Sequence, residues 1–176
     1  MFVLDGGRRF VIPRTEMTYP GHNMKLHQNA ADPAKAPVDV VVADFEDGCP
    51  WEFKGPKSRA VVVDAFNTLD FGGKVVCVRP NGIQSPFFLG DLEAIVRGAP
   101  NRFHGIVLPK ASSAEDVLYA ARLLAALETG GGHLAPGKAV VGLFAHRFVE
   151  EADGLFCAVA ALGGEQSPGA PRCRAP

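Results

Sequence analysis

The sequence predicts an α/β fold built on a parallel β-sheet, and two observations support this. The first is a nearly continuous apolar run at residues 38–45, which ends in the acidic pair Glu46-Asp47. A β-branched run of this kind is typical of a strand buried on both faces, as strands of parallel sheets are. The second is the regular spacing of the predicted strand ends, which fall near residues 20, 47, 79 and 109. Intervals of about 30 residues are the size of one β-α-β unit.

The first half of the chain supplies three of the predicted strands. Residues 14–21 form a short strand that ends at Pro20-Gly21, and residues 22–31 favour a helix. After the strand at 38–45, Gly55-Pro56 places proline at the first position of a helix, where its missing N–H costs no helical hydrogen bond. The apolar face of this helix comprises Val61, Val62, Ala65, Phe66 and Leu69. The third strand is predicted at residues 74–78.

The second half continues the alternation. A helix at 91–97 leads to a strand at 105–108, and the S-x-x-E pattern at 112–115 is a capping box that opens the next helix. Its predicted inner face comprises Val117, Leu118, Ala121, Leu124 and Ala125. A fifth strand is predicted at 139–144 and a fifth helix at 148–162. Residues 163–176 are rich in Gly, Pro and Arg, a composition that favours disorder.

Strict alternation of strands and helices indicates a parallel sheet with right-handed crossovers. A complete (β/α)8 barrel, the TIM barrel, takes about 250 residues. The chain has 176 residues, 47% of them hydrophobic, and only about five β-α units are visible. We therefore expect an incomplete barrel of the TIM-barrel type as one domain over residues 1–162, followed by a disordered tail at 163–176.

Composition narrows the classes of partner. The net charge is −1, with 18 basic and 19 acidic residues and no basic stripe, so no nucleic-acid partner is expected. No window approaches the roughly 20 apolar residues of a membrane helix, so no membrane partner is expected either. The N-terminal segment lacks the apolar core of a secretory signal. The four cysteines contain no C-x-x-C pattern. We expect a cytoplasmic protein, with the mitochondrial matrix or another organelle as an open alternative.

Polar side chains follow the predicted strands at the points where they end. Parallel strands present their carboxyl ends at one edge of a sheet, which is where ligands bind in α/β proteins. The residues expected there are Glu46, Asp47, Arg79, Asn81 and Lys110. Carboxylate oxygens suit a hard cation such as Mg²⁺, and the planar guanidinium of arginine binds a carboxylate through two parallel hydrogen bonds. This edge could therefore hold a metal ion and an anionic substrate.

Each of these residues also has a simpler interpretation. The acids Asp44, Glu46 and Asp47 could cap the next helix or pair with Lys54, Lys57 or Arg59. Lys110 would then be a solvated lysine at a strand end, and Asp91 would cap its own helix. The histidines lack metal-ligand spacing, and His22, His27, His104 and His133 are expected in loops or at the surface. No G-x-S-x-G, P-loop or G-x-G-x-x-G motif is present, so catalysis by a serine nucleophile has no support.

Six motifs in order along residues 14–128 resemble the HpcH/HpaI aldolase and citrate lyase β-subunit family, in particular its CitE-like branch of malyl-CoA and citramalyl-CoA lyases. They are Arg14 with Pro20-Gly21; Asp44-Phe45-Glu46-Asp47-Gly48; Lys54 with Arg59; Val78-Arg79-Pro80-Asn81-Gly82; Asp91-Leu92; and Leu108-Pro109-Lys110 followed by Ser113-Ala114-Glu115-Asp116-Val117. No single motif is specific, and the evidence lies in their order and spacing.

The resemblance implies a Mg²⁺-dependent lyase that cleaves or forms a carbon–carbon bond in a 3-hydroxy-dicarboxylyl-CoA thioester. Such cleavage passes through an enolate whose developing negative charge must be stabilised. By resemblance, Arg79 is the catalytic residue that holds the substrate carboxylate, with Arg14 and Asn81 also binding substrate. Glu46 and Asp47 would support the metal through its bound waters. An acyl-CoA substrate and a homo-oligomer are expected from the family.

The sequence departs from the family at the fifth strand. The family has a metal-binding glutamate there, whereas this chain has Phe144-Ala145-His146-Arg147. The second metal-binding aspartate follows a sixth strand that is not visible, so no direct metal ligand is assigned. Two alternatives therefore stand beside the lyase: a catalytically inactive half-barrel that binds acyl-CoA or serves as an assembly subunit, and a thioesterase of the malyl-CoA type.

Overall fold

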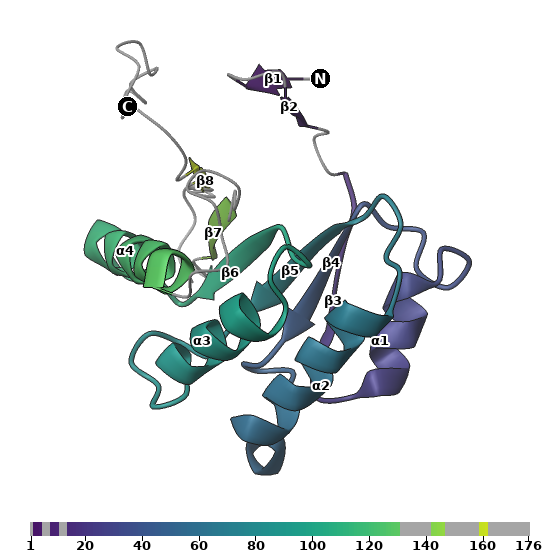
Figure 1. Cartoon of the computed structure of the whole chain (residues 1–176), viewed down its shortest axis with the longest axis horizontal. Coiled ribbons are helices and arrows are strands. Elements are labelled where there is room, and N and C mark those ends of the chain that lie inside the picture. The colour runs from purple at the N-terminus through teal and green to yellow at the C-terminus, as the bar shows by residue number, and fades with distance from the viewer. Residues whose placement is uncertain (1, 5–7, 11–13, 131–141, 147–158, 162–176) are drawn as a thin grey trace, which may run out of the picture.

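The computed structural model describes residues 2–4, 8–10, 14–130, 142–146 and 159–161, with side chains over 14–128 (Figure 1). Within these residues, six strands form one sheet in the order β3-β4-β5-β6-β7-β8. A separate antiparallel pair joins β1 (Phe2–Leu4) to β2 (Arg8–Phe10). The disordered tail predicted at 163–176 lies outside the described residues, and the domain boundary at residue 162 stays a prediction.

Strands and helices alternate along the chain as the sequence predicts. The parallel strands are β3 (Glu16–Pro20), β4 (Val40–Asp44), β5 (Val75–Arg79), β6 (Gly105–Pro109) and β7 (Gly142–His146). The helices are α1 (Met24–Ala31), the 3-10 turn η1 (Trp51–Phe53), α2 (Pro56–Thr68), α3 (Phe88–Gly98) and α4 (Ala114–Gly130). The predicted α/β class with consecutive β-α units is therefore confirmed, and it matches part of a TIM barrel.

The chain departs from strict alternation at its last described element. β8 (Val159–Ala161) runs antiparallel to β7. The helix predicted at 148–162 is therefore wrong over 159–161, and its remainder lies outside the described residues. The apolar run at these positions suits a buried strand as well as a helix, an ambiguity that periodicity cannot resolve in so short a segment. Of the strand predicted at 139–144, residues 142–144 belong to β7.

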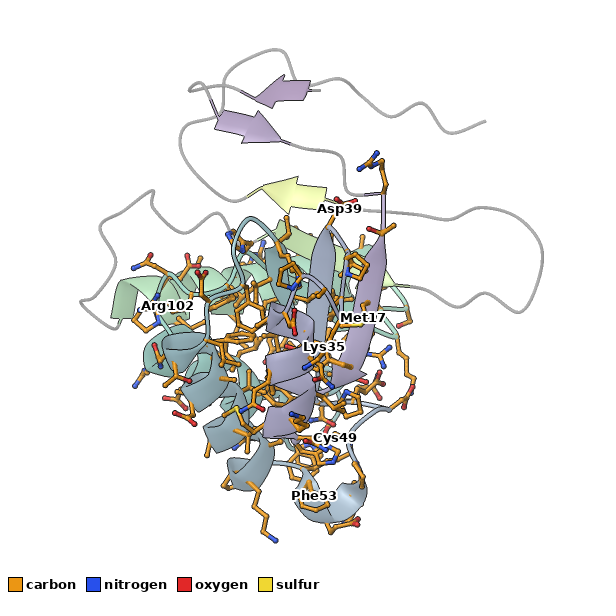
Figure 2. The ribbon with its side chains drawn as sticks, turned by 90° about the vertical axis from the view of Figure 1, so that its right-hand side faces the viewer. Met17, Lys35, Asp39, Cys49, Phe53 and Arg102 are labelled. Atoms are coloured by element: carbon orange, nitrogen blue, oxygen red, sulfur yellow. The ribbon has the colours of Figure 1, made fainter. Side chains whose placement is uncertain are left out.

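The four helices α1 to α4 cover one face of the sheet (Figures 1 and 2). Alternation along β4 divides its side chains between two clusters, because successive residues of a strand point to opposite faces. Val41 and Ala43 join the large core beneath the helices, whereas Val40 and Val42 join a small cluster with Cys77 and Val107 on the other face. All five β4 residues are buried, as expected of a strand inside a parallel sheet.

The strand register places the carboxyl ends on one edge. Pro20 of β3 lies opposite Asp44 of β4, and Asp44 lies opposite Arg79 of β5. Figure 2 shows the two ends of this layer, with Asp39 before β4 at one end and Cys49 after it at the other. The side chains that follow Asp44, Arg79 and Pro109 therefore meet at the Cys49 end.

Helix α4 differs in detail from its prediction. Its buried residues include Ala120, Ala121, Leu124 and Leu127, whereas Leu118 is exposed. Ala125 is also exposed, so the true inner face is rotated from the predicted one. The cap is shifted as well, because Ser113 Oγ accepts a hydrogen bond from the Asp116 N–H at 3.2 Å. Asp116 Oδ2 in return accepts from the Ser113 N–H at 3.2 Å, so the reciprocal pair is Ser113–Asp116 rather than Ser112–Glu115.

His27 is the clearest error among the predicted surface histidines, because it is fully buried. Its Nε2 lies 2.9 Å from the Gly21 carbonyl and its Nδ1 lies 2.9 Å from the Tyr19 hydroxyl. A neutral ring that donates from Nε2 and accepts at Nδ1 satisfies both partners. Burial lowers the pKa of His27, and the hydrogen bond to Gly21 only partly opposes this. The imidazole thus fastens the Pro20-Gly21 turn to α1.

The lowered pKa of His27 predicts a loss of stability in acid. Below the ordinary histidine pKa of 6.5 the unfolded chain takes up a proton that the folded chain resists, so the free energy of unfolding falls as pH falls. The slope from this residue is at most about 1.4 kcal/mol per pH unit. Urea unfolding at pH 8.0, 6.5 and 5.5 measures it. His27→Gln, which cannot be protonated, should flatten the profile, and an unchanged profile would contradict the assignment.

Candidate active site at the carboxyl edge

The loop after β4 is shaped by its own aspartate. Asp44 Oδ1 accepts a hydrogen bond from the Glu46 N–H at 2.8 Å, and Oδ2 accepts one from the Gly48 N–H at 2.7 Å. A Cβ atom at position 48 would lie 2.6 Å from Asp44 Oδ2, a distance that side chains do not tolerate. The acidic motif that ends in glycine therefore folds into a tight turn around the Asp44 carboxylate. This turn places Glu46 and Asp47 at the carboxyl edge of the sheet.

Arg79 closes on the same carboxylate from the neighbouring strand. Its Nε donates to Asp44 Oδ1 at 2.8 Å, and its Nη2 donates to Asp44 Oδ2 at 2.6 Å. The two side chains therefore form a bidentate ion pair. The Asp44 side chain is 1% exposed and that of Arg79 is 20% exposed. Burial raises the pKa of Asp44, but the guanidinium and the two N–H groups outweigh it and lower the pKa overall. The ion pair fixes the plane of the guanidinium.

Glu46 lies beside this pair and links it to Lys110. Its Oε1 is 2.8 Å from Lys110 Nζ, and its Oε2 is 3.8 Å from Arg79 Nε. Lys110 also contacts Asp47 Oδ1 at 3.1 Å. The buried Oε2 of Glu46 has no hydrogen-bond partner among the described residues. The structure thus brings Glu46, Asp47, Arg79 and Lys110 together. The side chain of Lys110 is 68% exposed, in agreement with the expected solvated lysine at a strand end, and it also forms ion pairs with both acids.

A second layer of buried polar groups supports this edge. Lys54 Nζ donates to the carbonyl oxygens of Phe45 and Glu46 at 2.9 and 2.7 Å, and to Asn81 Oδ1 at 2.7 Å. Asn81 in turn donates from Nδ2 to Asp91 Oδ2 at 2.7 Å. Lys54 therefore binds the backbone carbonyls of the acidic loop. The simpler interpretation of the sequence paired it with the carboxylates of that loop instead.

Asn81 and Asp91 have roles that the sequence did not predict. Asn81 is 3% exposed, and both ends of its amide are bonded within the protein, so it faces Lys54 and Asp91 rather than solvent. Asp91 is fully buried and accepts from Arg59 Nε at 2.8 Å. Asp91 thus ties α2 to the loop after β5, and the expectation that it caps its own helix is wrong.

Arg14 does not join the cluster. It precedes β3 at the amino edge of the sheet, where its Nε lies 3.8 Å from Asp39 Oδ2, and its side chain is 86% exposed. Its backbone N–H donates to the same oxygen at 2.8 Å. Arg14 and Arg79 therefore lie at opposite ends of the strands, roughly 16 Å apart for five residues at about 3.3 Å each. The substrate-binding role implied for Arg14 stays a prediction without support from this geometry.

Aromatic side chains that the sequence did not single out border the same edge. Trp51 is 72% exposed and meets Phe87 edge-on, with ring centroids 5.4 Å apart. Phe53 stacks on His22 at 4.6 Å, and Figure 2 shows Phe53 at the Cys49 end of the molecule. A short 3-10 turn leaves few side chains buried, which explains this exposure. The result is exposed apolar surface in the 3-10 turn between the acidic loop and α2.

The charged cluster by itself does not fit a resident magnesium ion. Among the described residues, no group of three or more His, Cys, Asp or Glu side chains is arranged to hold a metal. Asp44 is engaged by Arg79, and the ammonium of Lys110 lies between Glu46 and Asp47. A hard divalent cation prefers about six oxygen ligands, of which this edge offers few that are free. No direct magnesium ligand is therefore assigned in this part of the chain.

The buried ion pair predicts unequal effects of two similar substitutions. Asp44→Asn leaves the Arg79 guanidinium without its counter-charge and should lower the free energy of unfolding by about 3 kcal/mol. Asp47→Asn removes a carboxylate whose side chain is 64% exposed. This substitution should change the free energy of unfolding by less than about 0.5 kcal/mol. Urea titrations of both variants beside the wild type measure the difference. Equal small losses in the two variants would show that the Asp44–Arg79 pair is not a main stabilising contact.

Proteins named as lyases match most of the chain. It is 33% identical over 123 residues to the L-malyl-CoA/beta-methylmalyl-CoA lyase of a Cereibacter sphaeroides strain, covering 70% of this chain and 37% of that protein. It is 28% identical over 137 residues to the malyl-CoA/beta-methylmalyl-CoA/citramalyl-CoA lyase of Chloroflexus aurantiacus, covering 78% and 37%. The chain thus spans little more than a third of the length of these relatives.

Solved structures agree in fold. A magnesium/glyoxylate complex of Haloferax volcanii malate synthase superposes with a TM-score of 0.64 at 20% identity, over 74% of this chain and 42% of that one. The citrate lyase beta subunit of M. tuberculosis, complexed with oxaloacetate and magnesium, superposes with a TM-score of 0.52 at 26% identity, over 74% and 45%. In both cases this chain covers somewhat less than half of the larger protein. No helix among the described residues is long and apolar enough to cross a membrane.

The match to a family model covers more of the chain than any of these comparisons. The model for HpcH/HpaI aldolase/citrate lyase matches residues 14–161, which include every element from β3 to β8. The charged edge lies within this range. The chain belongs to the HpcH/HpaI aldolase/citrate lyase family.

Proposed function

We propose that this chain acts as a carbon–carbon lyase on a 3-hydroxy-dicarboxylyl-CoA thioester of the malyl-CoA or citramalyl-CoA type. The observation that carries the proposal is Arg79, held rigid by Asp44 beside the buried carboxylate of Glu46. A fixed arginine at the carboxyl edge of an α/β sheet suits recognition of a substrate carboxylate. Relatives named as malyl-CoA lyases match 70% or more of the chain, which favours this substrate class over others.

In this proposal Arg79 binds and orients the carboxylate of the substrate. Its Nε and Nη2 are used by Asp44, and no partner of Nη1 is seen within residues 14–128. The remaining N–H groups can donate to a carboxylate with charge assistance. The ammonium of Lys110 adds a second positive charge nearby, and such charges stabilise an anion that develops during bond cleavage. Lys54, Asn81 and Asp91 act through the backbone of the loop rather than on the substrate.

Magnesium is proposed for the lyase because structural relatives were solved with it. No residue that the structure describes is proposed as its direct ligand. Glu46 and Asp47 would influence it only through water, and no step of the reaction is assigned to them. An acyl-CoA partner, self-association and a cytoplasmic location belong to the same proposal.

The test uses the purified full chain with malyl-CoA and citramalyl-CoA in the presence of magnesium. The expected products are acetyl-CoA and the cognate 2-oxo acid. Arg79→Lys keeps the positive charge but loses the planar, bidentate geometry of the guanidinium. It should reduce kcat/KM roughly 100-fold, because a contact that stabilises charge in the transition state is lost. The matched control is Arg97→Lys, since Arg97 forms an exposed pair with Glu93 on α3. Full activity of the Arg79 variant would reject the assigned role.

Product identity also separates the alternatives. Release of free CoA and an intact dicarboxylate would indicate a thioesterase, because the thioester alone would be cleaved. Absence of turnover at high enzyme concentration, with acyl-CoA binding retained, would favour a non-catalytic subunit.

A non-catalytic, partner-dependent role is the second candidate, and one feature favours it. β3 is the outermost strand of the described sheet and pairs only on its β4 side within the described residues. An open strand edge invites pairing with another chain. If this role holds, the isolated chain should self-associate or require a full-length relative for cooperative unfolding. Light scattering and thermal melting measure this, and a monodisperse monomer with one sharp transition would count against it.

A further inference from the structure

Lys110 occupies the centre of the acidic pair at the carboxyl edge. Its Nζ lies 2.8 Å from Glu46 Oε1 and 3.1 Å from Asp47 Oδ1, so one ammonium bridges two carboxylates. Glu46 is 7% exposed, and its second oxygen has no hydrogen-bond partner among the described residues. A buried carboxylate needs a counter-charge, and Lys110 is the nearer of two cations at Glu46, since Arg79 Nε lies 3.8 Å from its second oxygen.

The backbone at Lys110 supports a specific placement. Its φ is +51°, and over residues 14–130 only Asn101 shares a positive φ among non-glycine residues. A long side chain rarely adopts this left-handed conformation, and it persists where the surroundings hold it. The conformation occurs directly after β6, before the chain enters α4. The backbone conformation at Lys110 and its two ion pairs with Glu46 and Asp47 therefore occur together at the end of β6.

The charges at this edge balance without an added ion. Three carboxylates, Asp44, Glu46 and Asp47, lie among three cations: Arg79 on Asp44, Lys110 on the other two, and Lys54 on the loop carbonyls. A divalent cation at Glu46 and Asp47 would sit beside the Lys110 ammonium and within reach of Arg79. Like charges at such short distances repel one another.

We propose that Lys110 is the resident counter-ion of Glu46 and Asp47, so that a divalent cation can reach these two carboxylates only when the lysine side chain leaves them. The edge then has two alternative states, one closed by the tethered ammonium and one open to a metal. A hard cation with oxygen ligands, such as Mg²⁺ or Mn²⁺, is the competitor that the donor chemistry selects.

The experiment measures binding of Mn²⁺ alone to the full chain, by water proton relaxation, with no substrate and no turnover. Two variants remove the ammonium: Lys110→Met, and Lys110→Gly, which accepts the positive φ without strain. Both should bind Mn²⁺ about tenfold more tightly than the wild type, a difference of about 1.4 kcal/mol. Lys35→Met is the matched control. Lys35 forms an exposed ion pair with Asp32, and its loss should leave the affinity for Mn²⁺ unchanged.

A double variant shows whether the gain arises at this edge. Glu46→Gln added to Lys110→Gly should return the affinity to the wild-type value, even if Mn²⁺ also binds elsewhere on the chain. Equal Mn²⁺ affinity in the wild type and both folded Lys110 variants would overturn the proposal, as would a gain that survives Glu46→Gln. Since no reaction is measured, this outcome is independent of whether the chain is a lyase.

Discussion

The ion pair between Asp44 and Arg79 is the constraint on which the carboxyl edge depends. It joins the last residues of two neighbouring parallel strands, and the same carboxylate organises the turn that carries Glu46. Both functions require Asp44 to remain ionised in a buried position, and the guanidinium and backbone N–H groups that lower its pKa provide this. The fold of the acidic loop and the orientation of the arginine are thus one electrostatic arrangement.

Much of this arrangement follows from local sequence signals. Continuous apolar runs that stop at polar residues locate the carboxyl ends of β4 and β5, and parallel pairing then requires Glu46 and Arg79 to be neighbours. Spacing of about 30 residues predicts the β-α units. These inferences depend on patterns within single elements and on one rule of topology, so they need no knowledge of which side chains touch.

The remaining features are set by tertiary contacts that no local pattern records. His27 resembles a polar helix residue in sequence, yet it is buried because Tyr19 and the Gly21 carbonyl lie where its two nitrogens point. The ion pair of Lys110 with Asp47 joins residues 63 apart in the chain, and it forms across β5, which lies between β4 and β6 in the sheet. Asn81 looks available for a ligand until Lys54 and Asp91 occupy both ends of its amide.

The glycine at position 48 has a consequence for how this edge can change over evolutionary time. The Asp44 carboxylate fills the space that any Cβ there would need, so a larger residue would displace the group that orients Arg79. Substitutions are therefore expected first at the solvent-facing Asp47 and in the aromatic turn beyond Cys49. Side chains there can vary without disturbing the buried ion pair. New ligand preferences in descendants of this chain would first arise at those outward positions.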